Sequence, residues 1–446
     1  MKSKSNSRAP HRPETPYFYI KTLGCQVNAA DSNAIASHLS SLSMKYTEEK
    51  ERADVIVLNT CTVRDEVEHN AMAFIGRLKA LKLSKPALKI VISGCAAERL
   101  GQALKRKFPF VDLVTGAKEI GRFPEIFDGV FGTAGEKPLT AHCLPPRDRE
   151  SPEAAFITIT RGCENFCSYC IVPQVRGPEI SRPAPEIIAE IEGFVRRGFK
   201  EVVLLGQNVN SYSGLDAQSL PVTFPALLKL VNAVDGLKRV RFMTSHPKDL
   251  SGGLIEAMTA LKKVCGHLHL PLQSGSDSML KAMNRGYTAG QYLELVEKLR
   301  ARMPAISLTT DILVGFPGET KSDFQKTLDI IERARFNSLY AYKYSPREGT
   351  ASFSIPDNVT ENEKDSRLDK VREVSIRLSK EIHAKLKGGV ETVLVERAEG
   401  LKRTGRTGSN LKVFFDASRG KALPGSFVEV KIRNARINTL LGELVS

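Results

Sequence analysis

The sequence "TRGCENFCSYCIVP", residues 160–173, places Cys163, Cys167 and Cys170 in a C-x3-C-x2-C spacing. Metal sites closed by sulfur ligands usually have four cysteines, yet the next cysteine in the chain is Cys265. A zinc ribbon would need a second pair nearby, and the sequence has none. Three thiolates on one curled loop can hold three corners of a [4Fe–4S] cluster and leave one iron without a protein ligand. The spacing therefore predicts an iron–sulfur site with an open position for a substrate.

Strand-like and helix-like segments alternate around this loop, from residue 154 onward. The predicted strands are residues 155–161, 201–206, 238–243, 267–272, 307–315 and 338–344. The predicted helices are residues 184–198, 222–234, 249–262, 287–302 and 320–334. Six βα units in this length are typical of a partial or full TIM-type barrel. The strands end in polar and glycine residues, as in "LGQNVNS" and "VGFPGE", and the C-terminal face of such barrels carries the chemistry.

A second βα series occupies residues 16–131. Its strand-like runs are "YFYIKTLG", "ADVIVLNTC", "LKIVISGC" and "VDLVTG", separated by helical patterns at 31–42, 64–82 and 96–107. Repeated βα units predict an α/β domain with a parallel sheet and helices on both faces.

Three cysteines of this segment occupy equivalent places. Cys25 follows the first strand, Cys61 ends the second and Cys95 ends the third. Open α/β sheets bind ligands outside the carboxyl ends of their strands, so the three thiols can meet at one edge. The alternative is three separate buried cysteines, which are common core residues.

The remaining segments differ in composition. Residues 1–15 form a basic, Pro- and Ser-rich tail, which we expect to be disordered, and residues 132–153 form a linker. Residues 154–386 contain the barrel and a charged connecting helix at 357–386. Residues 387–446 contain short strands and predict a small β-barrel that contacts nucleic-acid backbone or presents a solvated basic surface. Its basic residues include Lys402, Arg403, Arg406, Lys412, Lys431, Arg433 and Arg436.

The composition is that of a globular protein with an excess of positive charge. The 446 residues carry 65 Lys and Arg against 50 Asp and Glu, a net charge of +15, which favours a polyanionic partner such as nucleic acid. No apolar run reaches the roughly 18 residues of a membrane span, and the N-terminus lacks the apolar core of a signal peptide. We therefore expect a cytoplasmic protein, in which eight cysteines favour metal or cluster binding over disulfides.

Several longer motifs resemble one known family. They are "YIKTLGCQVNAADS", "NTCTVRDEVEHNA", "SGCAAER", "TRGCENFCSYCIVPQVRGPEISRP", "LPLQSGSDSMLKAMNRGYT" and "DILVGFPGET". Together they resemble the methylthiotransferases of the radical S-adenosylmethionine (SAM) superfamily. The resemblance covers nearly the whole chain and implies a flavodoxin-like domain, a radical SAM partial barrel and a C-terminal TRAM barrel. "GCQVN" and "VRGPEISRP" are most similar to the branch that methylthiolates C2 of isopentenyladenosine beside the tRNA anticodon.

The resemblance also implies cofactors and partners. Cys163, Cys167 and Cys170 would hold a [4Fe–4S] cluster that binds SAM, and a second [4Fe–4S] cluster would be held by Cys25, Cys61 and Cys95. The expected partners are tRNA and a reductant such as a flavodoxin or ferredoxin, and we expect a monomer.

Other residues are weaker candidates. Tyr169 is expected to pack on the SAM adenine or to fill the core, and Arg182 to pair with the SAM carboxylate or with a surface carboxylate. His246, His267, His269 and Cys265 fit structural roles better than catalytic ones. Strand-end residues with an implied SAM contact are Gly206, Gln207, Asn208, Gln273, Ser274, Asp311 and Gly315.

Two other functions remain open on the sequence. A sister branch of the same family modifies an aspartate of a ribosomal protein. The other is a protein of another class, an iron–sulfur electron carrier or scaffold that binds RNA. Such a protein would need no substrate cavity, whereas a barrel with polar strand ends provides one.

Overall fold

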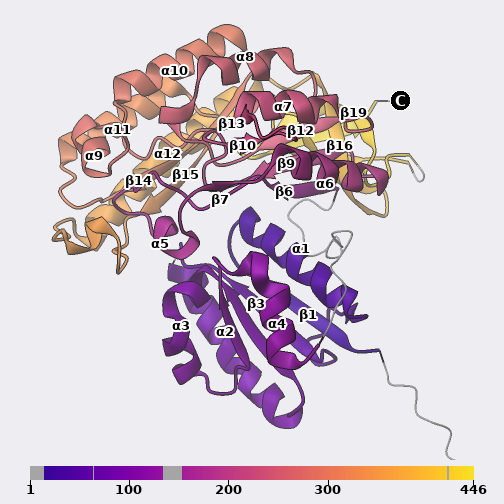
Figure 1. Cartoon of the computed structure of the whole chain (residues 1–446). Helices are drawn as coiled ribbons and strands as arrows, with labels where there is room; N and C mark the ends of the chain where they lie inside the picture. Colours follow the sequence, from indigo (N-terminus) through magenta and orange to yellow (C-terminus); the bar gives the residue numbers. More distant parts are fainter. Residues whose placement is uncertain (1–14, 64, 134–152, 419–420, 446) are drawn as a thin grey trace, which may run out of the picture. The chain divides into compact units, whose positions relative to one another are not determined.

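The computed structural model describes residues 15–63, 65–133, 153–418 and 421–445 (Figure 1). The chain forms two compact units. As far as they are described, the first comprises Met1–Gly24, Asp31–Cys61 and Glu66–Leu144, and the second comprises Cys25–Ala30, Thr62–Asp65 and Pro145–Ser446. The predicted tail and linker lie almost wholly outside the described residues, so the predicted domain boundaries stay predictions. No described helix is long and apolar enough to cross a membrane.

The first unit contains a five-stranded parallel sheet. Its strands are β1 (Tyr17–Thr22), β2 (Lys45–Tyr46), β3 (Val55–Thr60), β4 (Lys89–Gly94) and β5 (Leu113–Gly116). The order β2-β1-β3-β4-β5 is that of the flavodoxin-like doubly wound sheet, which confirms the predicted fold. The helices are α1 (Gln26–Ser41), α2 (Asp65–Ser84), α3 (Cys95–Lys107) and α4 (Phe123–Phe131).

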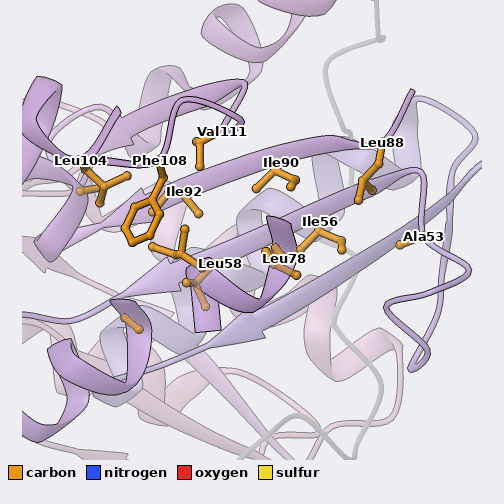
Figure 2. Packing of buried hydrophobic residues seen from close by; sticks show 13 residues of the cluster. Ala53, Ile56, Leu58, Leu78, Leu88, Ile90, Ile92, Leu104, Phe108 and Val111 are labelled. Carbon is orange, nitrogen blue, oxygen red and sulfur yellow. The ribbon is translucent and has the colours of Figure 1, made fainter. Parts of the chain in front are cut away.

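Both faces of this sheet are buried, as its apolar strands predict. Side chains alternate along β3, so Ile56 and Leu58 pack with Leu78 of α2 on one face (Figure 2). Val55 and Val57 belong to the cluster on the other face, which includes residues of α1 and α4. Two buried faces explain why the central strands are nearly continuous apolar runs.

The second unit contains the predicted partial barrel. Its strands are β6 (Ala154–Thr158), β9 (Glu201–Leu205), β12 (Arg239–Phe242), β13 (His267–His269), β14 (Ser307–Val314) and β15 (Ser338–Lys343). They form two parallel sheets, β12-β9-β6 and β13-β14-β15, and a bridge between Val240 and Val264 lies where the two meet. Among the described residues no ladder joins β6 to β15, so the barrel is open there.

The predicted barrel helices are present with small shifts of their ends. They are α6 (Ala184–Arg196), α7 (Phe224–Ala233), α8 (Gly252–Ala260), α10 (Ala289–Arg302), α11 (Lys321–Ala334) and the connecting helix α12 (Glu361–Ala384). Short elements were not predicted, because one or two turns show no hydrophobic period. These are α5 (Val172–Arg176), α9 (Asp277–Ala282), and the pairs β7–β8 (Thr160–Arg161 with Ile180–Ser181) and β10–β11 (Ser213–Leu215 with Pro221–Thr223).

The C-terminal strands form the predicted small barrel. They are β16 (Val390–Glu399), β17 (Lys402–Thr407), β18 (Lys412–Asp416), β19 (Phe427–Ala435) and β20 (Thr439–Leu444), and they close in the order β16-β17-β18-β20-β19. This barrel belongs to the second unit, together with the larger barrel.

A buried carboxylate anchors the small barrel to the larger one. The contact lies at the end of the larger barrel where its strands begin, which we call the floor. Glu201, the first residue of β9, accepts hydrogen bonds from Arg239 and Arg241 of β12, the latter at 2.8 Å. The other N–H groups of the two guanidinium side chains donate to main-chain carbonyls of residues 406–408. Burial alone would raise the pKa of Glu201, but the two arginines outweigh it and lower the pKa. The carboxylate therefore stays charged and holds both arginines in place.

We expect Arg241→Met to destabilise the second unit. The change leaves the fully buried Glu201 with one partner and leaves carbonyls of the small barrel unpaired, and removing one partner of a buried pair costs about 3–5 kcal/mol. Urea unfolding followed by circular dichroism measures the loss. Arg377→Met is the control, because Arg377 pairs with Glu332 at the exposed surface. Equal unfolding midpoints for the two variants would contradict a structural role of the buried pair.

Candidate functional site

The cysteine loop, residues 162–171, connects β7 to α5. Cys163 and Cys167 are buried and Cys170 is partly buried. The main-chain N–H of Cys163 donates to the carbonyl of Gly177, and that of Cys170 donates to the carbonyl of Cys167 at 2.9 Å. Ser168 donates to the carbonyls of residues 282 and 283 through its hydroxyl and its N–H. The loop is therefore held from both sides and is not free to unfold locally.

The three thiols of this loop share one electrostatic environment. Burial, and secondarily the neighbouring Cys167, raises the pKa of Cys163 and raises that of Cys170 to about 12. Both are therefore protonated thiols at neutral pH, and a metal that binds them must displace their protons. A set of sulfur donors fits a soft iron–sulfur group and does not fit a hard cation such as Mg²⁺. Within the part of the chain that is described, no group of three His, Cys, Asp or Glu residues is arranged to hold a single metal ion.

Arg285 is a site residue that the sequence did not single out. It is 4% exposed and donates to the sulfur of Cys167 at 3.2 Å, to the hydroxyl of Tyr287 at 3.0 Å and to the carbonyl of Pro271 at 3.0 Å. Its Nη1 also lies 3.5 Å from the hydroxyl of Tyr169. The only signal in the sequence was its place in the motif "LPLQSGSDSMLKAMNRGYT". A permanent positive charge thus touches the middle cysteine of the loop.

The turn after β9 supports the cysteine loop directly. Gln207 accepts a hydrogen bond from the N–H of Gly162 at 2.7 Å. Gly206 lies so close to Thr160 that an added Cβ would fall 2.0 Å from its hydroxyl oxygen, so no larger residue fits. Asn208 donates to Asp249 at 2.6 Å. The predicted stretch 206–208 therefore lies at the site, and Gln207 positions the loop that carries the cysteines.

Three buried polar atoms at the ends of β9 and β12 have no hydrogen-bond partner among the described residues. They are Oδ1 of Asn208, Oγ of Ser245 and Nε2 of His246. Nδ1 of His246 accepts the N–H of Lys248 at 3.3 Å, which leaves the ring proton on Nε2. Burial, with the charges of Arg285 and Lys248, lowers the pKa of His246 to about 2. His246 thus offers a neutral N–H donor at Nε2. Buried polar atoms without a partner are rare unless a ligand or water satisfies them.

The residues of β13 and β14 are mostly engaged with one another. The main chain of Gln273 bonds to Asp311 and Leu313, at 2.8 and 2.9 Å, and holds Gln273 at a φ of 73°. The hydroxyl of Ser274 accepts the N–H of Ser276 and contacts Thr327. The hydroxyl of Ser274 is therefore engaged within the protein.

The histidines of β13 are also paired within the barrel. His269 lies between Thr309 and Asp311, at 3.0 and 3.3 Å, and His267 also contacts Thr309. These three contacts lie within the barrel and fit the structural role predicted for the two histidines.

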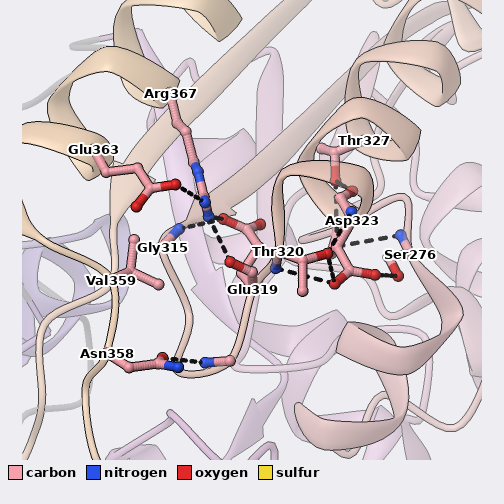
Figure 3. A network of polar contacts seen from close by, with 12 residues as sticks. Ser276, Gly315, Glu319, Thr320, Asp323, Thr327, Asn358, Val359, Glu363 and Arg367 are labelled. Atoms are coloured by element: carbon pink, nitrogen blue, oxygen red, sulfur yellow. Dashed lines mark hydrogen bonds and ion pairs between the residues drawn. The ribbon is translucent and has the colours of Figure 1, made fainter.

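A polar network shapes the turn after β14 (Figure 3). Glu319 accepts from the N–H of Gly315 at 2.7 Å and from the guanidinium of Arg367 on α12. An added Cβ at Gly315, whose φ is 73°, would fall 2.3 Å from Lys364. Asp323 accepts from Thr320, Ser276 and Ser278, and these bonds overcome burial and keep its pKa well below the usual value. The predicted "VGFPGE" turn is thus fixed by the connecting helix.

Three weaker candidates have structural partners. The guanidinium of Arg182 donates to Glu190 at 2.7 Å and to the carbonyl of Thr158 at 2.8 Å, so the ion-pair alternative describes its geometry. Tyr169 packs with the buried cluster that contains Phe316 and fills the core. Cys265 is buried, as expected.

The small barrel corrects one prediction. Arg403 is 4% exposed and donates to the carbonyls of Gly400, Lys402 and Ala422, so its predicted exposure to nucleic acid is wrong. Arg406 pairs with Glu396 at 3.1 Å. These two side chains stabilise the fold of the barrel.

In the first unit, the ends of the strands that precede the three cysteines lie side by side. The N–H of Leu23 donates to the carbonyl of Asn59 at 2.9 Å, and Thr60 of β3 pairs with Gly94 of β4. Cys61 directly follows β3, and Cys95 directly follows β4; both are buried. Cys25 comes three residues after β1, belongs to the second unit and is exposed. A shared site of all three remains a prediction.

Comparisons with known proteins agree with this architecture. Two family models match the chain: Uncharacterized protein family UPF0004 over residues 17–116 and Radical SAM superfamily over residues 157–331. A solved radical S-adenosylmethionine methyltransferase, TsrM from Kitasatospora setae, has a similar fold, with a TM-score of 0.55 at 12% identity over 76% of this chain and 74% of that one. The barrel and its cysteine loop are those of a radical SAM protein.

Curated relatives narrow the assignment. Proteins from Thermoanaerobacter sp. (strain X514), Endomicrobium trichonymphae and Geobacter metallireducens are 43%, 42% and 43% identical to this chain over 96% of its length. The matches cover 93%, 100% and 98% of those proteins, and each is named tRNA-2-methylthio-N(6)-dimethylallyladenosine synthase. The chain belongs to this family.

We expect Gln207→Leu to loosen the cysteine loop. The change keeps the volume of the side chain but leaves the N–H of Gly162 without its acceptor, which costs about 1–3 kcal/mol. Hydrogen–deuterium exchange should become roughly tenfold faster across residues 161–170. In the control Gln325→Leu, the lost partner is the exposed Asp329 one turn along α11, and exchange in the loop should not change. Unchanged exchange in Gln207→Leu would show that other contacts hold the loop.

Proposed function

We propose that this chain is a tRNA-modifying enzyme that places a methylthio group on C2 of isopentenyladenosine next to the anticodon. The observation that carries the proposal is the match to synthases of this name over 96% of the chain; the two family models span both three-cysteine sets. At the substrate, the C2–H bond is broken and a C2–S–CH3 group replaces the hydrogen. The partners are tRNA and an electron donor such as a flavodoxin or ferredoxin, and the enzyme acts as a monomer in the cytoplasm.

The cysteines supply the ligands of two [4Fe–4S] clusters in this proposal. Cys163, Cys167 and Cys170 hold one on the barrel, and Cys25, Cys61 and Cys95 hold the second at the carboxyl edge of the flavodoxin-like sheet. The support is the donor chemistry: each set offers three thiols and no carboxylate, which suits a cluster with one open iron. When bound, the clusters together with SAM would supply the radical that removes the C2 hydrogen and the sulfur and methyl group that replace it.

The unpartnered polar atoms at the barrel's upper face have a role in this proposal. Nε2–H of His246 donates to the bound adenosyl group or base, and Oδ1 of Asn208 accepts from it. Their burial favours this role, because an unsatisfied buried donor or acceptor costs about 1–3 kcal/mol that a ligand recovers. The other predicted strand-end residues act by shaping the surrounding turns; they are Gly206, Gln207, Gln273, Ser274, Asp311 and Gly315. Arg182 and Tyr169 remain candidates for SAM contact only if they exchange their present partners.

The proposal is tested on the nucleosides of a strain that lacks the gene. Mass spectrometry should show loss of 2-methylthio-isopentenyladenosine, and its unmodified precursor should accumulate. The wild-type gene should restore the product, whereas Cys163→Ala should not, because one ligand of the first cluster is gone. An intact nucleoside together with an unmodified ribosomal-protein aspartate would favour the sister activity. Two unchanged products would favour a carrier or scaffold.

Arg285 should raise the reduction potential of the barrel cluster. Its charge and its hydrogen bond to Cys167 favour the reduced, more negative state. A charge-assisted bond of about 1.5–3 kcal/mol corresponds to a shift on the order of 60–130 mV for one electron. Arg285→Met should shift the potential to more negative values by this amount in an EPR-monitored titration.

The titration is made in protein whose Cys25, Cys61 and Cys95 are replaced by alanine, so that only the barrel cluster is loaded. Arg285→Lys keeps the charge and should retain most of the potential. If Arg285→Met and the parent protein have the same potential, Arg285 serves packing alone.

A further inference from the structure

A cavity lies at the end of the barrel opposite the cysteine loop. Its volume is about 610 Å³, within the usual range of ligand sites. One wall consists of residues at the starts of β9, β12 and β13, and the other consists of residues of the small barrel, including Thr392 of β16 and Phe427 of β19. The cysteine loop, in contrast, lies at the carboxyl ends of the strands. The cavity is therefore separate from the site described above.

The lining of this cavity is basic. It includes Lys200, Lys238, Arg239, Lys262 and Lys263 and contains no Asp or Glu. We call it the basic cavity. Like charges gathered around one space repel one another, and the repulsion weakens only where counter-ions approach. An anion inside the basic cavity would weaken this repulsion.

The lysines of the basic cavity have no acidic partner among the described residues. Arg239 pairs with the buried Glu201, which it shares with Arg241, but none of the four lysines takes part in an ion pair. Only Lys263 has a side-chain hydrogen bond, to the carbonyl of Val234 at 2.7 Å. Lys238 and Lys262 are exposed. The four ammonium groups therefore keep most of their donor hydrogens for a ligand.

The chemistry of the lining points to phosphate groups without base recognition. The hydroxyl of Thr392 donates to Glu429 and that of Ser426 to the carbonyl of Leu423, so neither proton is free to read a base. Lysine binds phosphate as a point charge and does not form the planar fork by which arginine reads a base or a carboxylate. Contacts of this kind add affinity that depends on salt and not on sequence.

We propose that the basic cavity binds the phosphate backbone of the RNA substrate. The proposal rests on the proposed function and deepens it, because it places a part of tRNA binding on the floor of the barrel. The shared chemistry is a phosphate anion, which a free nucleotide could also supply. We favour RNA because five basic residues gather around one cavity and the chain carries a net charge of +15.

The test measures tRNA affinity as a function of salt for Lys200→Gln/Lys238→Gln/Lys262→Gln. Each phosphate contact contributes about 0.7–0.9 to the slope of log K against log salt, so the slope should become shallower by about 2–3. Lys298→Gln/Lys321→Gln/Lys326→Gln is the control, since these lysines lie on α10 and α11 and also lower the net charge from +15 by three, to +12. The control slope should stay close to that of the parent protein. Equal slopes for the two triple variants would overturn the proposal.

Further variants separate charge from shape. Lys200→Arg/Lys238→Arg/Lys262→Arg keeps the charges and should retain the slope. The single change Lys238→Gln, at an exposed side chain, should reduce the slope of log K against log salt by roughly one. It replaces the triple variant in the test if that variant is unstable. Lysine acetylation with mass spectrometry should show that tRNA protects Lys238 and Lys262 but not Lys298. Absence of this protection would also overturn the proposal.

The remaining arms identify the source of the phosphate. Adenosine monophosphate is titrated into the parent protein and the triple glutamine variant by calorimetry. Binding that only the parent shows, with no difference in tRNA slope, would assign the cavity to a free nucleotide. If the parent protein does not bind tRNA at all, the proposed function fails; if it binds and only the slope prediction fails, the proposed function stands and the basic cavity has no part in it.

Discussion

The parallel register of β6, β9 and β12 is the constraint on which both ends of the barrel depend. Thr158 pairs with Leu205, and Glu201 pairs with Ala154 and Arg239. Because the strands run in the same direction, the segments that follow them gather at one edge and the segments that precede them gather at the other. The same ladder therefore brings Gln207 to the cysteine loop at one end and gathers the basic residues at the other.

The two ends solve the problem of buried charge in different ways. On the floor, Glu201 pairs with two arginines, and the other N–H groups of these arginines donate to backbone carbonyls of the small barrel. At the upper face, Arg285 is buried, and no carboxylate of the described ranges contacts it; its partners are two tyrosine hydroxyls, a carbonyl and the sulfur of Cys167. An uncompensated buried cation is costly. A cluster with thiolate ligands would supply the missing negative charge.

The sequence predicted the elements well, because apolar runs bounded by glycine and polar residues give strands and helices directly. It could not predict contacts between distant loops. Arg285 meets Cys167 across 118 positions, and only the folded barrel brings the two together. In the case of Arg403, the signal was present but was missed: side chains alternate along β17, and the alternation places Arg403 on the buried side and Lys402 on the exposed one. Arg182 had two possible partners, and in the structure it pairs with Glu190 on the next helix, whose proximity the sequence did not show.

The length of β9 limits how one RNA could reach both ends. Glu201 and Leu205, the two ends of β9, are four residues apart, which in a strand corresponds to about 13 Å. At about 3.4 Å per stacked base, this distance is roughly four stacked nucleotides. An RNA that contacts both ends must therefore span at least this length along the outside of the barrel. Since the Glu201 pair fixes the small barrel to the floor, the separation does not change with the sequence of the RNA, as is needed for contacts that position a substrate without reading it.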